Sequence, residues 1–120
     1  MDKVSIARKL AQIDKPWTPK IISGVDDYDV KIAWMEGDFI WHSHADADEL
    51  FLVIEGTLRM DFRDRQVTVE PGELLVVPRG VEHRPHTDTR CGVLMFERKG
   101  LVNTGDGPAG DLTVENPERI

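Results

Sequence analysis

The sequence predicts an all-β sandwich or barrel, because short runs of alternating apolar and polar residues recur along the chain and turn signals separate them. Residues 29–34 and 57–63 alternate with a period of two, which is the pattern of a half-buried strand. Turn-forming pairs such as Glu55-Gly56 and Pro71-Gly72 follow such runs. A third observation is the clustering of the histidines, which is taken up below.

The chain divides into three parts. Val4 to Ile13 spaces its apolar residues roughly as one face of a helix, and Pro16 stops it. We therefore expect an N-terminal helix and lead-in at residues 1–18, one barrel at 19–100 and a C-terminal tail at 101–120. The strand-like runs are residues 29–34, 39–44, 49–54, 57–63, 66–69, 74–77 and 90–97. The tail is rich in Gly, Pro, Asn and Asp, so we expect it to wrap the surface or partly fray and to contribute no chemistry.

Composition narrows the possible partners. The 120 residues include 15 Lys and Arg against 22 Asp and Glu, a net charge of −7, which fits one ordinary domain and disfavours nucleic acid and anionic membranes. No apolar run approaches the roughly 18 residues that span a bilayer. The first ten residues contain no apolar signal core, and Cys91 is the single cysteine, so we expect a cytoplasmic protein with a buried, inert thiol.

All four histidines fall in two short segments. His42 and His44 lie two apart in an expected strand, which places both imidazoles on one face, toward the barrel interior. Glu49 opens the next strand after a turn, so a hairpin returns its carboxylate to the two imidazoles. His83 follows the turn at Pro78-Arg79-Gly80, where the facing sheet of a barrel supplies a fourth group.

Each of these pieces alone has an ordinary structural explanation: a hydrogen-bonded histidine pair, an edge charge or a surface histidine. Together, three imidazoles and one carboxylate suit Fe, Mn, Ni, Co, Cu or Zn. Four protein ligands on a six-coordinate ion leave two positions open for water or substrate, and an open site can polarise a bound oxygen. The spacing therefore predicts a divalent transition-metal site at His42, His44, Glu49 and His83.

The sequence resembles the cupin superfamily, specifically its small single-domain members. The two cupin motifs are matched between Gly37 and Thr87, by Gly37, His42, His44, Glu49 and Gly56 in the first and by Gly72, Pro78, Gly80 and His83 in the second. Gly37 precedes His42 by five positions where the family has six, and Thr87 replaces the final asparagine of the second motif. The resemblance implies a double-stranded β-helix, a jelly-roll barrel commonly paired as a homodimer, and the same four metal ligands.

The most concrete functional hypothesis is a metal-dependent enzyme of oxygenase or isomerase type that acts on a small polar metabolite. The alternative is a non-catalytic module that binds or senses a small ligand at the same metal. The catalytic acid or base is not identifiable from the sequence. His86 is expected to face away from His83, and Trp41 away from the metal. The outward row Leu50, Leu52 and Ile54 predicts a homodimer, or else a site for the N-terminal helix.

Overall fold

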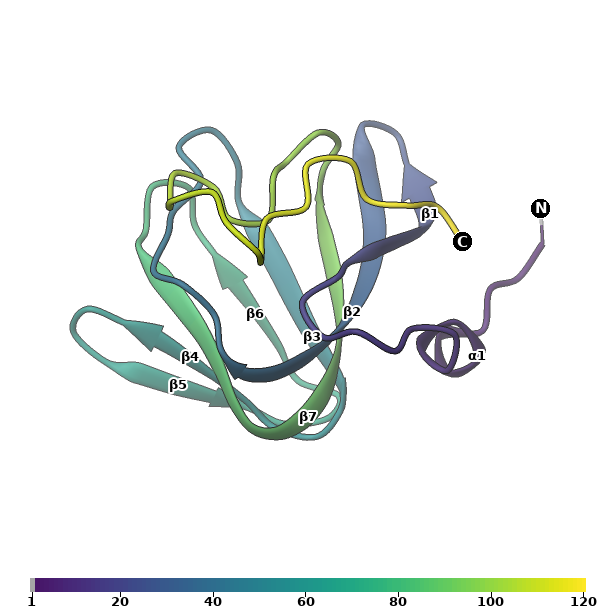
Figure 1. The fold of residues 1–120 in the computed structure, drawn as a ribbon, viewed down its shortest axis with the longest axis horizontal. Coiled ribbons are helices and arrows are strands. Elements are labelled where there is room, and N and C mark those ends of the chain that lie inside the picture. The colour runs from purple at the N-terminus through teal and green to yellow at the C-terminus, as the bar shows by residue number, and fades with distance from the viewer. Residues whose placement is uncertain (1) are drawn as a thin grey trace.

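A computed structural model describes residues 2–120, and within them the chain is almost entirely β, as the sequence predicts. The elements along the chain are α1 (Ile6–Leu10), β1 (Lys20–Val25), β2 (Tyr28–Asp38), β3 (Glu49–Glu55), β4 (Leu58–Phe62), β5 (Gln66–Val69), β6 (Leu74–Val77) and β7 (His83–Arg98) (Figure 1). None of the helical structure in residues 2–120 is long and apolar enough to cross a membrane.

The strands form an antiparallel barrel that is organised around β7. One run of neighbours is β1-β2-β7-β3-β6, and β4 pairs with both β5 and β7. The first residues of β7, His83 to His86, pair with β4, whereas its second half pairs with β2 on one side and β3 on the other. One strand of 16 residues therefore belongs to both walls of the barrel and carries His83 at one end and Glu97 near the other.

The barrel is filled by side chains that alternate inward along its strands. Leu58, Met60, Val53, Cys91 and Val93 have no exposed surface, and they belong to one cluster with Ala33, Met35, Phe51, Val69, Val77 and Met95. The free thiol of Cys91 lies in this cluster, as expected, and burial raises its pKa to about 11. Fully buried apolar side chains each contribute about 1.5–3 kcal/mol to folding, so this cluster is the main source of stability.

The alternation on β2 separates two environments. Lys31 and Ala33 are about as buried as Ile32, because both faces of this strand are covered. Ile32 packs outside the barrel in a second cluster with Leu10, Ile13 and Ile22, and Trp34 lies against the same cluster and donates its Nε1–H to Leu10 O at 2.9 Å. The helix α1 is shorter than the helical face from Val4 to Ile13, and Ser5 caps it by accepting from Arg8 N.

Residues 39–44 do not form the expected strand. After β2 ends, Phe39 N still donates to Pro85 O, and His42 and His83 exchange a pair of backbone hydrogen bonds at 2.9 and 3.1 Å. These isolated hydrogen bonds replace a continuous ladder, because the segment passes from β2 to β3 and lies beside β7 only briefly. The strand prediction was wrong here, although the alignment with β7 that it implied is retained at His42.

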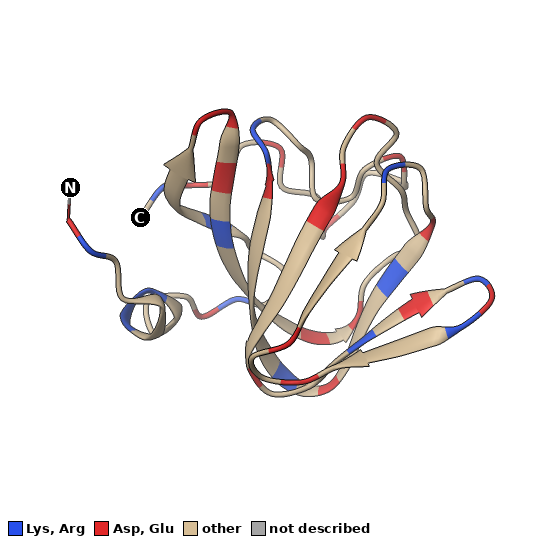
Figure 2. Cartoon of the chain, turned by 180° about the vertical axis from the view of Figure 1, so that it is seen from behind, with Lys and Arg blue, Asp and Glu red and all other residues tan. Residues whose placement is uncertain are grey.

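The tail lies across one end of the barrel and returns to β1 (Figure 1). Its last residues pair with β1 through Ile21 N to Glu118 O at 2.9 Å and Ile120 N to Ile21 O at 3.0 Å. The tail wraps the barrel as expected, and its contacts extend further, to the segment that holds His42 and His44. Charged residues of both signs are interspersed over the chain (Figure 2).

Candidate metal centre

The fold brings the four predicted ligands together. One donor atom from each of His42, His44, Glu49 and His83 lies within 4.8 Å of the other three, and all four residues are buried. His42 and His44 come from the connection between β2 and β3, while Glu49 and His83 are the first residues of β3 and β7. Two rigid strand ends and one loop therefore supply the four side chains.

Two of the imidazoles are oriented by the backbone next to them. His42 Nδ1 lies 2.9 Å from Ile40 O, and His83 Nδ1 lies 2.9 Å from Val81 O. A carbonyl oxygen only accepts, so each Nδ1 must carry the hydrogen and donate it. Each Nε2 is then left unprotonated, with a lone pair available to a metal, which is the second-shell arrangement found at many histidine-ligated metals.

Three donor atoms of this cluster are buried without a hydrogen-bond partner in residues 2–120: His44 Nε2, His83 Nε2 and Glu49 Oε1. Each of the two nitrogens lies 3.4 Å from Glu49 Oε1, which is longer than an ordinary hydrogen bond. An unsatisfied buried polar group costs about 1–3 kcal/mol, and three that converge on one point are costly unless something binds them. A divalent cation accepts all three lone pairs, so the residues present fit a metal ion.

The protonation states suit the same group. Burial and the neighbouring His83 lower the pKa of His42 to about 4, so its imidazole is neutral near pH 7. Burial alone raises the pKa of Glu49, but the close approach of Glu97, His44 and His83 outweighs burial and holds the pKa of Glu49 well below its usual range. Neutral imidazole and ionised carboxylate are the forms that bind a metal.

A second buried carboxylate lies beside Glu49. Glu97 pairs in register with Glu49 across β3 and β7, and with Asp29 across β2 and β7. Lys31 Nζ donates to Glu97 Oε1 at 2.8 Å and to Leu101 O at 3.4 Å, while Glu97 Oε2 and Asp29 Oδ1 have no partner in the described chain. Burial and the adjacent Glu49 raise the pKa of Glu97 well above its usual range.

The charges of this acidic row, defined as Asp29, Glu97 and Glu49, bear on the metal. The raised pKa of Glu97 favours its neutral form, whereas Glu49, which faces the imidazoles, favours the ionised form. A buried ionised carboxylate is expensive without a partner, so Glu49 is a second reason to expect a cation here. Red acidic segments on neighbouring strands are visible in Figure 2.

A narrow cavity of about 30 Å³ adjoins His42 and Glu49. A water needs roughly 10–15 Å³ of such volume, so the cavity admits one or two molecules of that size. Its walls are mostly apolar and aromatic, and Trp17 stacks on Phe39 with ring centroids 4.8 Å apart. The lining residues are Trp17, Pro19, Ala33, Met35, Phe39, His42, Glu49, Phe51, Pro85, Met95, Glu97 and Asn103.

Comparison with known proteins assigns this chain to a family. The family model described as "Cupin domain" matches residues 30–97, more than half of the chain. The chain belongs to the cupin family. Among curated proteins, the uncharacterized protein YdbB of Bacillus subtilis (strain 168) is 40% identical over 79 residues, which cover 65% of this chain and 70% of YdbB.

Solved structures agree. A cupin-2 domain containing protein from Shewanella frigidimarina NCIMB 400 superposes with a TM-score of 0.79 at 40% identity, covering 80% of this chain and 94% of that one. Protein NMB1881 from Neisseria meningitidis gives 0.75 at 30% identity, covering 82% and 100%. Hydroquinone 1,2-dioxygenase PnpCD, solved with Cd²⁺ and 4-hydroxybenzonitrile, gives 0.67 at 19% identity over 87% and 76%, a likeness of fold alone.

The tail of this cupin, which we expected to contribute no chemistry, reaches the site. Asn103 lines the cavity, and Asp106 accepts hydrogen bonds from both Ser43 N and Ser43 Oγ, at 2.6 and 2.9 Å. Gly105 packs against Ser43 and His44. No periodicity or motif marks these residues, because their role comes from where the tail crosses the barrel rather than from a local pattern.

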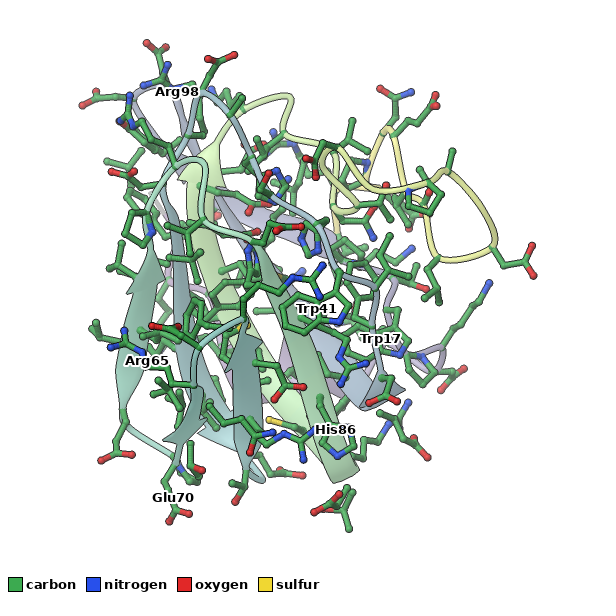
Figure 3. All side chains as sticks on the ribbon, turned by 90° about the vertical axis from the view of Figure 1, so that its left-hand side faces the viewer. Trp17, Trp41, Arg65, Glu70, His86 and Arg98 are labelled. Atoms are coloured by element: carbon green, nitrogen blue, oxygen red, sulfur yellow. The ribbon has the colours of Figure 1, made fainter. Side chains whose placement is uncertain are left out.

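Other residues considered from the sequence lie elsewhere in the cupin. His86 is not part of the cluster, because its two ring nitrogens contact Asp38 and Asp88. Trp41 packs beneath the guanidinium of Arg63 at 3.9 Å, and the two labelled residues Trp41 and His86 are well separated on the face seen in Figure 3. Thr87, at the position of the motif asparagine, is buried, and its Oγ1 has no partner in the described chain.

Arginine side chains can bind anionic substrates, but three arginines of this chain have other partners. Arg79 binds Asp48, Arg84 binds Asp61, and Arg90 stacks over Trp34. These contacts lie outside the cavity lining, so none of the three arginines contributes to the metal cluster.

Proposed function

We propose that this cupin binds one divalent transition metal through His42, His44, Glu49 and His83 and is an enzyme of oxygenase or isomerase type that acts on a small metabolite there. The observation that carries the proposal is the convergence of three unpartnered buried donor atoms on one point. A bound metal would supply Lewis-acid polarisation, or a site for dioxygen, at its open positions. The metal is one of Fe, Mn, Ni, Co, Cu or Zn, which all accept this mixed nitrogen and oxygen donor set.

The residues around the cluster have separable roles in such a reaction. The apolar walls exclude water and confine the ligand, and Trp17 and Phe39 offer flat faces to an unsaturated or aromatic group. Glu97 Oε2 has no partner in residues 2–120 and lies in the cavity lining together with Glu49, so it would hydrogen bond with a hydroxyl or amine of the ligand. Lys31 holds the other oxygen of Glu97 and fixes the direction of that carboxylate.

The size of the cavity bears on how a ligand enters. A volume of about 30 Å³ holds a water or a diatomic molecule, and a metabolite needs the walls to move. Trp17 lies outside the strands, before β1, and is not part of the hydrogen-bonded tail, so this wall is where we expect the movement. A likeness to the dioxygenase above at 19% identity supports only that such a barrel accommodates a metal and a small aromatic ligand.

The test begins with metal content. Protein purified without added metal, and then loaded with Fe²⁺, Mn²⁺ or Ni²⁺, is expected to bind one ion per chain by elemental analysis. His44→Ala should lose most of this metal while keeping the β spectrum, and Glu49→Gln should weaken binding because an amide oxygen is a poorer ligand than a carboxylate. His86→Ala is the matched control and should retain full occupancy. Full occupancy in His44→Ala would overturn the site.

Catalysis is tested separately on the loaded protein. Oxygen uptake and product formation are followed with a panel of small phenols, enols and keto acids, with His44→Ala as the blank. Turnover supports the enzyme. Saturable binding without turnover supports the alternative, a non-catalytic binding or sensing module that uses the same metal.

We also propose that the protein is a homodimer paired through the outer face of β3 and β6. Leu74 and Val76 are 58% and 45% exposed there, and Leu50 and Leu52 next to them are only half-buried, whereas the cluster around α1 covers Ile54. A stable monomer at micromolar concentration in sedimentation would remove this proposal. A cytoplasmic location, suggested by the single buried cysteine, is checked by fractionation.

A further inference from the structure

The three imidazoles of the cluster are held in two different ways. His42 and His83 are each fixed by a carbonyl two residues earlier in the chain, at 2.9 Å in both cases. His44 has no side-chain hydrogen bond to a backbone carbonyl within residues 2–120. Since its Nε2 is one of the three unpartnered donor atoms, something else must set the direction of this ring.

Gly105 of the tail lies against the other edge of that ring. A Cβ built at Gly105 would lie 3.1 Å from both Nδ1 and Cε1 of His44 and 2.2 Å from Ser43 O. The φ of Gly105 is +52°, in the left-handed region where a side chain is disfavoured. Glycine is therefore required here for two reasons, and its backbone forms the surface on which the imidazole rests.

Asp106 fastens this contact. Its carboxylate accepts from Ser43 N and Ser43 Oγ, and its own N–H donates to Ser43 O at 3.1 Å. The bonds from Ser43 lower the pKa of Asp106, so the carboxylate is ionised and the hydrogen bonds are charge-assisted. Ser43 stands between the two ligand histidines in the chain, so all three bonds act on the segment that presents them.

The tail is braced well enough to serve as a support. Asn103 receives a hydrogen bond from Val114 N and donates one to Leu112 O, both at 2.8 Å, and Thr104 and Thr113 join their hydroxyls at 3.1 Å. Thr104 is 2% exposed, although it lies in the tail that the sequence predicts to wrap the surface or partly fray. A loop that closes on itself in this way carries Gly105 and Asp106 as one unit.

We propose that the tail is part of the metal site, with Gly105 and Asp106 as positioning residues that set the imidazole of His44 for metal binding. This inference rests on the proposed function, since it takes His44 to be a metal ligand. It gives the tail a role that neither the ligand motifs nor the barrel requires. Removing outer supports of metal ligands typically lowers metal affinity by about 10–100-fold.

The experiment compares glycine variants in Co²⁺ titrations, in which the visible absorption of the ion reports its coordination. Gly105→Ala is expected to weaken Co²⁺ binding by about tenfold or more and to change the band shape, because His44 is displaced. Two matched controls should change affinity less than about twofold. Gly100→Ala has the same kind of positive φ, +83°, with nothing within 4 Å, and Gly110→Ala has open space and no positive φ.

A double-mutant cycle separates positioning from general destabilisation. In a His44→Ala background, the loss of Co²⁺ affinity caused by Gly105→Ala should be several-fold smaller, because the ring that Gly105 positions is absent and only the contact with Ser43 O remains. An equal loss in both backgrounds would overturn the inference. If Gly105→Ala does not fold, Asp106→Asn decides: a loss of about threefold or more with an altered band supports the inference, and an unchanged titration overturns it.

Two different results contradict the metal function and the role of the tail. Wild-type protein that binds no Co²⁺, Fe²⁺, Mn²⁺ or Ni²⁺ contradicts the proposed metal function, and this inference with it. Wild-type protein that binds the ion, with Gly105→Ala indistinguishable from Gly110→Ala, contradicts the role of the tail alone.

Discussion

The two ends of the barrel interior are equally buried but differ in what fills them. At the end where Val53 pairs with Val93, the interior is aliphatic, and the side chains have no exposed surface. At the end where Glu49 pairs with Glu97, the same strands turn carboxylates, imidazoles and an ammonium inward. Only a few residues along β3 and β7 separate the two.

The difference shows that the two ends of this small barrel contribute differently to stability and binding. Apolar packing is favourable without further conditions, whereas each buried charge must find a partner or a ligand to avoid a cost. Unpartnered atoms occur at the charged end and not among the aliphatic side chains around Val53. We therefore expect substitutions at the aliphatic end to change stability alone, and substitutions at the charged end to change both stability and binding.

The largest effect is expected from breaking the buried ion pair. Lys31→Met leaves Glu97 beside Glu49 without its cation and should lower the free energy of unfolding by about 3–5 kcal/mol in the metal-free protein. The double variant Lys31→Met/Glu97→Leu should recover most of this loss. Urea unfolding at pH 7 measures both, and a single variant as stable as the wild type would contradict the cost assigned to the charged end.

A cavity at the aliphatic end should cost slightly less. Leu58→Ala is expected to lower the free energy of unfolding by about 3 kcal/mol, and the Tm by roughly 10 °C, because its side chain is fully enclosed. Metal affinity, measured on folded protein at low temperature, should stay within about twofold of the wild type. A tenfold loss of affinity would show that the two ends are not separable.

Acid should destabilise the metal-free protein through His42. Its pKa is about 4 in the folded chain against 6.5 for the free side chain, so between these values the unfolded chain binds more protons and stability falls as the pH falls. The loss is about 2 kcal/mol from pH 7 to pH 5. His42→Gln should flatten this part of the pH profile in urea unfolding, and an unchanged slope would contradict the assignment.

The smallest effect is expected at His86, outside both ends. Asp88 and Asp38 raise its pKa, so its stabilisation is present at low pH and is lost as the pH rises through the folded value, opposite in sign to His42. His86→Ala should change the free energy of unfolding by less than about 1 kcal/mol near pH 5, and less still at pH 8. Thermal melts at pH 5 and pH 8 check whether the stabilisation by His86 decreases as the pH rises.

Much of the fold and the cluster could be predicted from the sequence, because both depend on short-range patterns. The alternation of apolar and polar residues located β3 through β6 closely. The spacing of His42, His44 and Glu49 indicated that their side chains meet at one point with that of His83. What periodicity could not assign was which face of β2 lies inside: Trp34 packs outside under α1, and Lys31 lies inside. Because α1 covers the outer face of β2, both faces of this strand are buried. The alternation of apolar and polar residues then no longer tells the inner face from the outer one.

The contribution of the tail was out of reach for a different reason. Ser43 and Asp106 are far apart in the chain. Their hydrogen bonds depend on where β7 ends and the tail begins to cross the end of the barrel. Local composition describes Gly105 and Asp106 only as turn-forming residues. Long-range contacts of single polar residues leave no periodic trace, so only the folded structure reveals them.

Cys91 lies on β7 in the region that joins the two walls, and its thiol is enclosed with a pKa of about 11. Alkylation requires the thiolate to attack the reagent, and the native chain provides neither the ionised sulfur nor the access that this step needs. Labelling of this single site therefore waits for β7 to leave the barrel. Cys91 is therefore an internal probe of the opening of the barrel. The rate of its alkylation, measured with and without metal, shows how much a bound ion slows this opening.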